Sequence, residues 1–174
     1  TLLGIIILRP YIARNSIASV IVVLSIAGSV LFLPSIGMYY GLHNWTASIS
    51  AGIVDAKFIA IINTALESPL GQVAMIPLLA WIAKNAPSNM KATFFAVFAS
   101  FTNLALSASA LLTKYLNEIF IITREVKDKV TNQIVSTPDY TELGILLITV
   151  TLLMLVLPIG AIFIVQRSRF KTTD

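Results

Sequence analysis

Four long apolar runs dominate this 174-residue sequence and restrict it to folds that are stable in a lipid bilayer. The composition is 57% hydrophobic and 11% charged, whereas soluble domains carry about 25% charged residues. A transmembrane helix needs about 20 mainly apolar residues. We therefore predict an all-α fold, a polytopic membrane helical bundle. Its four complete transmembrane helices are expected at about residues 16–34, 54–84, 93–113 and 143–165.

The connections between these runs differ in length and in polarity. Residues 35–52 are predicted to be a loop, and residues 86–89 a tight turn between two antiparallel helices. The polar stretch 114–140 is predicted to be a water-exposed loop that holds a short helix. The segment 2–8 is too short to span a bilayer. We interpret it as the end of a truncated helix and expect the chain to be the C-terminal part of a longer protein, although a short gene product is the alternative.

The basic residues lie mainly on one side of this four-helix arrangement. That side has only Asp174 as an acidic residue, and its basic residues are Arg9, Arg14, Lys84, Lys91, Arg167, Arg169 and Lys171. The opposite side mixes both signs of charge. Because cytoplasmic loops are enriched in Lys and Arg, we predict that loop 114–140 is external and that the tail 166–174 is cytoplasmic. The basic residues do not cluster with aromatic residues, so no nucleic-acid partner is expected.

Glu67 is the acidic residue within an apolar run, near the middle of segment 54–84. Carboxylates at this depth are costly in lipid and usually mark a route for substrate, ions or protons. Glu67 could bind a cationic group of a substrate or exchange a proton. The alternative is a protonated side chain that only bonds a neighbouring helix.

Two amides accompany Glu67 in the same segment. Asn63 lies four residues before it, on the same predicted helical face as Gly71. Gln72 lies about 100° further round the helix. Both amides could contact a ligand, and both could instead hold helices together.

Segment 93–113 carries a row of small and polar residues at spacings of three and four, which places them along one side of a helix. The row consists of Ala96, Ser100, Asn103, Ser107 and Ala110. Tight helix packing explains such a row. Ser100 and Asn103 are also candidates for the substrate pathway. The first and last segments are aliphatic, so we expect them at the periphery and the two polar segments inside.

Other signals favour no catalytic chemistry. The chain has no cysteine and one histidine, and no ligands stand at metal-binding spacing around His43. We predict no metal, no cofactor and no enzymatic activity. Tyr39, Tyr40 and Trp45 are interpreted as anchors at the membrane surface.

A set of motifs links the second and third apolar segments. It comprises Gly71-Gln72-Val73-Ala74-Met75-Ile76-Pro77, then Ala86-Pro87, then Ala92-Thr93-Phe94-Phe95-Ala96, with Ser100 and Asn103 following. Over about residues 55–165 the chain resembles the folate–biopterin transporter family of the major facilitator superfamily, and residues 113–120 resemble its bacterial branch. Members often carry an acidic residue near the position of Asn63, so this sequence departs from the family there.

The resemblance implies that the four spans are helices 9–12 of a twelve-helix symporter, in a bacterial inner membrane. We expect secondary transport of a folate-like or pteridine-like small-molecule substrate by alternating access. The missing N-terminal helical bundle of the same protein would be the partner, with the lipid bilayer around both. The alternatives are a major facilitator transporter of an unrelated solute, such as a sugar, muropeptide or drug, and a scaffold subunit of four helices that transports nothing.

Overall fold

The computed structural model describes residues 10–12, 14–73, 75–128 and 134–168, without side-chain detail at 68–73, 77, 80, 81, 84 and 85. The elements are α2 (Ile17–Tyr39), α3 (Leu42–Ile49), α4 (Ala56–Val73), α5 (Met75–Asn85), α6 (Lys91–Ile119), β1 (Val126–Lys127), β2 (Ile134–Ser136) and α7 (Leu143–Arg167). In the described part, α2, α6 and α7 are long and apolar enough to cross a membrane. The prediction of a mainly helical, polytopic chain is confirmed.

The fourth predicted span is divided between α4 and α5. Neither is long and apolar enough to count as a membrane-crossing helix by itself within the described residues. α5 has 11 residues, and the apolar sequence of α4 is interrupted by Lys57, Asn63 and Glu67. Three of the four predicted spans are therefore supported by the structure.

Helix α2 is longer than its sequence suggests. It begins after Ser16, whose hydroxyl accepts a hydrogen bond from the Ser19 N–H at 3.2 Å. It continues past Pro34, the predicted end, to Tyr39, because a proline removes one hydrogen bond without always ending a transmembrane helix. Gly41 follows with φ +88°, a backbone conformation that favours glycine. The predicted loop 35–52 thus contains the end of α2 and the whole of α3.

Helix α6 also extends beyond its predicted end, from 113 to Ile119. The loop that follows contains no short helix in its described part and instead forms a hairpin of β1 and β2. Two backbone hydrogen bonds between Thr123 and Asp139, at 3.1 and 3.0 Å, close the base of this loop. Its strands are short because polar turn residues outnumber the apolar residues.

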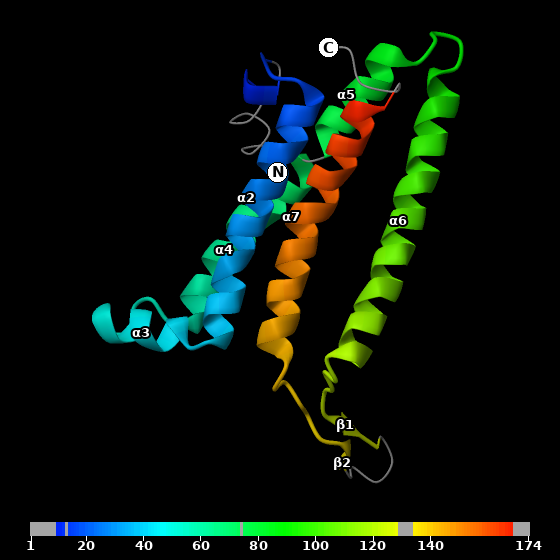
Figure 1. Ribbon diagram of the computed structural model, residues 1–174. Coiled ribbons are helices and arrows are strands. Elements are labelled where there is room, and N and C mark those ends of the chain that lie inside the picture. Colours follow the sequence, from blue (N-terminus) through cyan, green and yellow to red (C-terminus); the bar gives the residue numbers. More distant parts are fainter. Residues whose placement is uncertain (1–9, 13, 74, 129–133, 169–174) are drawn as a thin grey trace.

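Helix α2 is the centre of the packing. It contacts α7 along much of its length and also packs on α4, α3 and α5. The buried residues at its core include Val20, Leu24 and Leu146. The prediction that the first span is peripheral is wrong for the described part of the chain, because aliphatic helices with small residues pack closely on each other. α6 instead stands apart from α2 and α7, and its main contact is with α5 (Figure 1).

The helices run between two ends of the molecule. The start of α2, the turn between α5 and α6 and the end of α7 lie at the upper end in Figure 1, whereas α3 and the hairpin lie at the lower end. The Met90 N–H donates to the Pro87 carbonyl at 2.9 Å in the upper turn. The tight turn at 86–89 is thus confirmed.

Candidate functional site

Asn63 lies in α4 and is buried where this helix packs on its neighbours. Its side chain is 8% exposed, and its Oδ1 atom accepts no hydrogen bond from the described residues. α4 packs on α2, where Ser29 is 5% exposed and its hydroxyl also lacks a partner among those residues. At about 1.5 Å per residue, Ser29 lies about 15 Å before the end of α2 and Asn63 about 11 Å after the start of α4. Because α3 connects those two ends, the two groups lie at similar depth.

Glu67 lies one helical turn beyond Asn63 and is exposed. Its neighbours Thr64 and Leu66 are exposed as well. Asn63 and Glu67 differ by about 40° around the helix. Over this angle the surface of α4 changes from buried, at Asn63, to exposed, at Glu67. The structure therefore does not bring the two side chains into a single environment, although the sequence placed them on one face. Gln72 lies in α4, and its side chain is outside the described part.

The polar row of α6 is open along its whole length. No residue of α6 is buried, and Ser100 and Asn103 are both exposed. The Ser100 hydroxyl donates to the Ala96 carbonyl at 3.0 Å, and the Ser107 hydroxyl donates to the Asn103 carbonyl at 3.1 Å. These hydroxyls are satisfied within their own helix. The Asn103 amide is the strongest remaining hydrogen-bonding group of the row.

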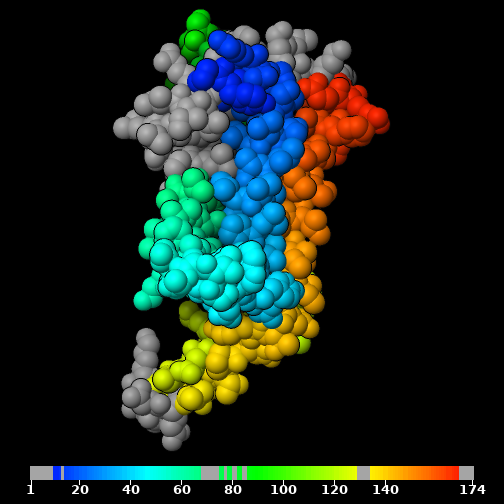
Figure 2. All heavy atoms as spheres, turned by 90° about the vertical axis from the view of Figure 1, so that its left-hand side faces the viewer, coloured from blue at the N-terminus to red at the C-terminus, as the bar shows by residue number. Residues whose placement is uncertain are grey.

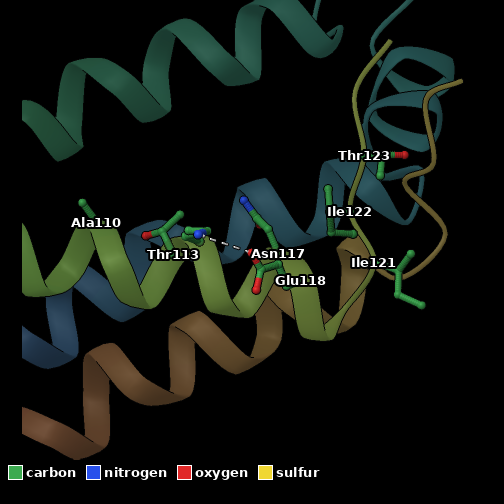
Figure 3. Close-up of a pocket in the computed structure, with 8 residues that line it drawn as sticks. Ala110, Thr113, Asn117, Glu118, Ile121, Ile122 and Thr123 are labelled. Atoms are coloured by element: carbon green, nitrogen blue, oxygen red, sulfur yellow. Dashed lines mark ion pairs between the residues drawn. The ribbon is translucent and has the colours of Figure 1, made fainter. Parts of the chain in front are cut away.

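An open groove of about 580 Å³ lies at the lower end of α6. Figure 3 shows its lining residues on the last turns of α6 and the segment that follows. They are Ala110, Thr113, Lys114, Asn117, Glu118, Ile121, Ile122 and Thr123. Lys114 Nζ lies 3.7 Å from Glu118 Oε1, and both side chains are more than half exposed, so this pair contributes little stability. Sequence reasoning missed the groove because it forms only where α6 continues past residue 113.

Ionic and metal-binding groups are sparse in the described residues. No group of three His, Asp or Glu side chains in that part could hold a metal ion. In the loop between α6 and α7, the Thr141 N–H donates to Asp139 Oδ1 at 3.0 Å. This bond, with a further one from the Thr141 side chain, holds the pKa of the Asp139 carboxyl below its ordinary value of 3.8. Asp139 stabilises a loop and does not line the polar helices.

Comparison with known protein families gives a match over residues 1–173 to the BT1 family, the folate–biopterin transporters. The chain belongs to this family. Comparison with curated proteins and with solved structures gave no significant match. Membership confirms the resemblance seen in the sequence. The three apolar helices and the family together make this an integral membrane protein of a transporter family.

Because the chain belongs to the BT1 family, the polar residues of α4 and α6 are considered in relation to transport. A transporter needs polar groups at membrane depth that face protein, solute or water. Among the described side chains of α4 and α6, Glu67 and Asn103 carry a carboxyl and an amide group, and both are exposed. Asn63, by contrast, is buried where α4 packs on other helices, which favours a role in holding helices together.

Proposed function

We propose that this BT1 protein carries out secondary active transport of a small organic solute, pteridine-like or folate-like, by alternating access. The chain would supply helices of one of two bundles that rock about a site near the middle of the membrane. The solute pathway would run along α4 and α6, past Glu67, Ser100 and Asn103.

The observation that carries this proposal is the exposure of Asn103. A helix of 29 residues crosses the full length of the molecule with no buried residue, yet it holds an amide near its midpoint. An amide left unpaired in hydrocarbon costs several kcal/mol, on the order of 2–7. The Asn103 face is therefore expected to contact protein, solute or water rather than lipid.

Glu67 is proposed to carry the coupling proton. It lies in the middle of the path from α4 to α5 and is exposed rather than packed against α2. Ionised carboxylates at membrane depth face aqueous cavities or partners. Glu67 is the acidic residue present in α4.

Three further features complete the proposal. The pair α4 and α5 is proposed as the fourth span, supported by its path from the lower end beside α3 to the upper end in Figure 1. The upper end, with Arg14, Lys91 and Arg167, is proposed to be cytoplasmic. A second helical bundle is proposed to cover the open side of α6, and the exposure of Asn103 supports this proposal.

The experiment is uptake of radiolabelled folate by vesicles that contain the chain reconstituted together with its proposed second helical bundle, measured across an imposed proton gradient. Glu67→Gln is expected to abolish the response to the gradient, and Asn103→Ala is expected to weaken uptake. The matched control is Glu118→Gln, which removes an exposed carboxylate at the end of α6.

The outcomes separate the parts of the proposal. Uptake by Glu67→Gln with an unchanged response to the gradient would remove Glu67 from the coupling mechanism. If the unaltered protein takes up another solute but not folate, the proposed substrate class is wrong and the proposed transport mechanism stands.

A further inference from the structure

Helix α3 lies crosswise at the lower end of the molecule. It occupies Leu42–Ile49, directly between the end of α2 and the start of α4, and points away from the long helices in Figure 1. Gly41 at φ +88° redirects the chain before it, and Ala51 and Gly52 at φ +53° and +85° redirect the chain after it. In Figure 2, α3 forms the cyan ledge across the face turned to the viewer, above the hairpin. Its position is thus set by turns at both ends.

One side of α3 is fixed to the rest of the protein. The Thr46 hydroxyl donates to the Val54 carbonyl at 2.8 Å, which joins the helix to the segment leading into α4. The His43 ring contacts the Met38 carbonyl at 3.1 Å, which joins it to the end of α2. Leu42 packs against Gly37, where an added Cβ would lie 2.7 Å from its Cδ2 atom. These contacts fix the rotation of α3 about its own axis.

The outer side of α3 has two different edges. Trp45 and Ile49 are separated by about 40° around the helix and form an apolar edge. Their side chains are 62% and 67% exposed, and Ile53 beyond the helix is 71% exposed. Asn44 and Ser48 form a polar edge about 100° away from the apolar one, also exposed. Such a division between two exposed edges suits a boundary between lipid and water.

We propose that α3 lies flat in the interfacial layer of the bilayer, with Trp45, Ile49 and Ile53 among the lipids and with Asn44 and Ser48 facing water. Three observations favour lipid over another protein as the occupant. α3 follows the membrane-crossing helix α2 without a spacer, so its depth is that of the bilayer surface. α2 also exposes apolar side chains in its second half, where Leu33 is 51% exposed. Tryptophan is enriched at this depth.

The segment around α3 carries no acidic residue, lysine or arginine, and this determines how it would interact with lipids. Residues 35–54 contain no Asp, Glu, Lys or Arg. The interaction therefore rests on insertion of apolar side chains and not on attraction to anionic headgroups. It should be equally strong in zwitterionic and anionic membranes.

Tryptophan fluorescence tests this proposal directly. The chain has two tryptophans, Trp45 and Trp81. A Trp81→Phe variant leaves Trp45 as the reporter, in protein reconstituted into phosphatidylcholine vesicles. Lipids that carry a spin label near the headgroup should quench it more strongly than lipids labelled near the chain end, and aqueous iodide should quench it weakly. Adding phosphatidylserine should leave these results unchanged.

A matched variant places the reporter on the other edge. Ser48→Trp, in a background with Trp45→Phe and Trp81→Phe, should be quenched by iodide more than by either lipid. If Trp81→Phe does not fold, the Trp45 signal is obtained as the difference between the unaltered protein and Trp45→Phe.

Three results would overturn the proposal. Strong quenching of Trp45 by iodide alone would place α3 in water. Quenching by neither iodide nor lipid would place it against protein. Strongest quenching by the label near the chain end would place it deep in the hydrocarbon.

Discussion

The ring of Tyr39, at the end of α2, lies directly against Gly144, at the start of α7. A Cβ added at Gly144 would lie 2.6 Å from Tyr39 Cδ1 and 2.6 Å from the Tyr40 hydroxyl oxygen. These are closer than any normal carbon contact. Just before Gly144 in the chain, the Thr141 carbonyl accepts a hydrogen bond from the Tyr39 hydroxyl at 2.7 Å. Together these contacts join two helices that are about a hundred residues apart in sequence.

Gly144→Ala should separate α2 from α7 at this end. Overpacking of a close contact typically costs about 1–3 kcal/mol, so we expect a lower temperature of unfolding in detergent, followed by circular dichroism. Gly160→Ala, in the same helix, is the control because an added Cβ there has no described atom within 4 Å. Equal thermal stability of the two variants would contradict the assigned contact.

Tyr39→Phe should keep the ring contact and remove only the hydrogen bond. A typical net value for one hydrogen bond is about 0.5–1.5 kcal/mol, so the loss should be smaller than in Gly144→Ala. Tyr40→Phe serves as the comparison, because the Tyr40 hydroxyl forms no hydrogen bond with the described residues. Urea unfolding of both variants measures the difference, and a larger effect at Tyr40 would reverse the assignment.

Asn63→Leu should leave the protein as stable as before or make it more stable. The buried Oδ1 of Asn63 has no partner among the described residues, and an unsatisfied buried polar group costs about 1–3 kcal/mol. Leucine has a similar volume and no such cost. The measurement is the unfolding free energy in detergent, with Asn103→Leu on the open face of α6 as control. A marked loss of stability in Asn63→Leu would show that the amide is hydrogen-bonded in the intact protein.

Acid should loosen the loop between α6 and α7 through Asp139. Its pKa is lowered in the folded protein, mainly by the bond from the Thr141 N–H. A lowered pKa means that the contribution to stability is complete above the ordinary value of 3.8 and is lost as the pH falls through the folded value. Hydrogen exchange at the Thr141 amide should therefore accelerate in that range. Asp139→Asn should remove this pH dependence, and Asp128→Asn should retain it.

The proposed orientation can be tested without background labelling from this chain, because it contains no cysteine. Thr137→Cys in the hairpin loop should react with an impermeant maleimide in intact cells. Ser168→Cys, after α7, should react only once the membrane is opened. The opposite pattern would invert the orientation drawn from the distribution of Lys and Arg.

The sequence predicted what hydropathy controls and missed what packing controls. The three apolar helices were found because each has a long, mainly apolar run without charged residues in its middle, whereas their ends were underestimated at Pro34 and at residue 113. A proline or a lysine lowers local hydropathy without ending a helix whose backbone bonds continue. The segment with Asn63 and Glu67 was predicted as one span, 54–84, but the structure divides it between α4 and α5, and its polar residues keep either helix from counting as a membrane-crossing helix within the described residues.

The candidate site was predictable in its residues and not in its geometry. The polar residues of α4 and α6 stand out in an apolar sequence, and the family was recognisable from the motifs that link these two segments. Whether Asn63 and Glu67 share an environment depends on which neighbour covers each side of α4. α4 packs on α2. Nothing in the sequence distinguished Ser29, which is buried, from the other small residues of α2.

The hydroxyls of α6 also bear on how this helix enters the membrane. The Ser100 and Ser107 hydroxyls donate to carbonyls of their own helix, so neither needs a hydrogen-bond acceptor from another helix when α6 enters the bilayer. These two residues therefore allow α6 to insert before any neighbour is in place. Asn103 cannot be satisfied in this way, since its amide carries two protons and a carbonyl. For Asn103, the free-energy cost of an unpaired amide in the membrane is removed only when α6 assembles with its neighbours, after insertion.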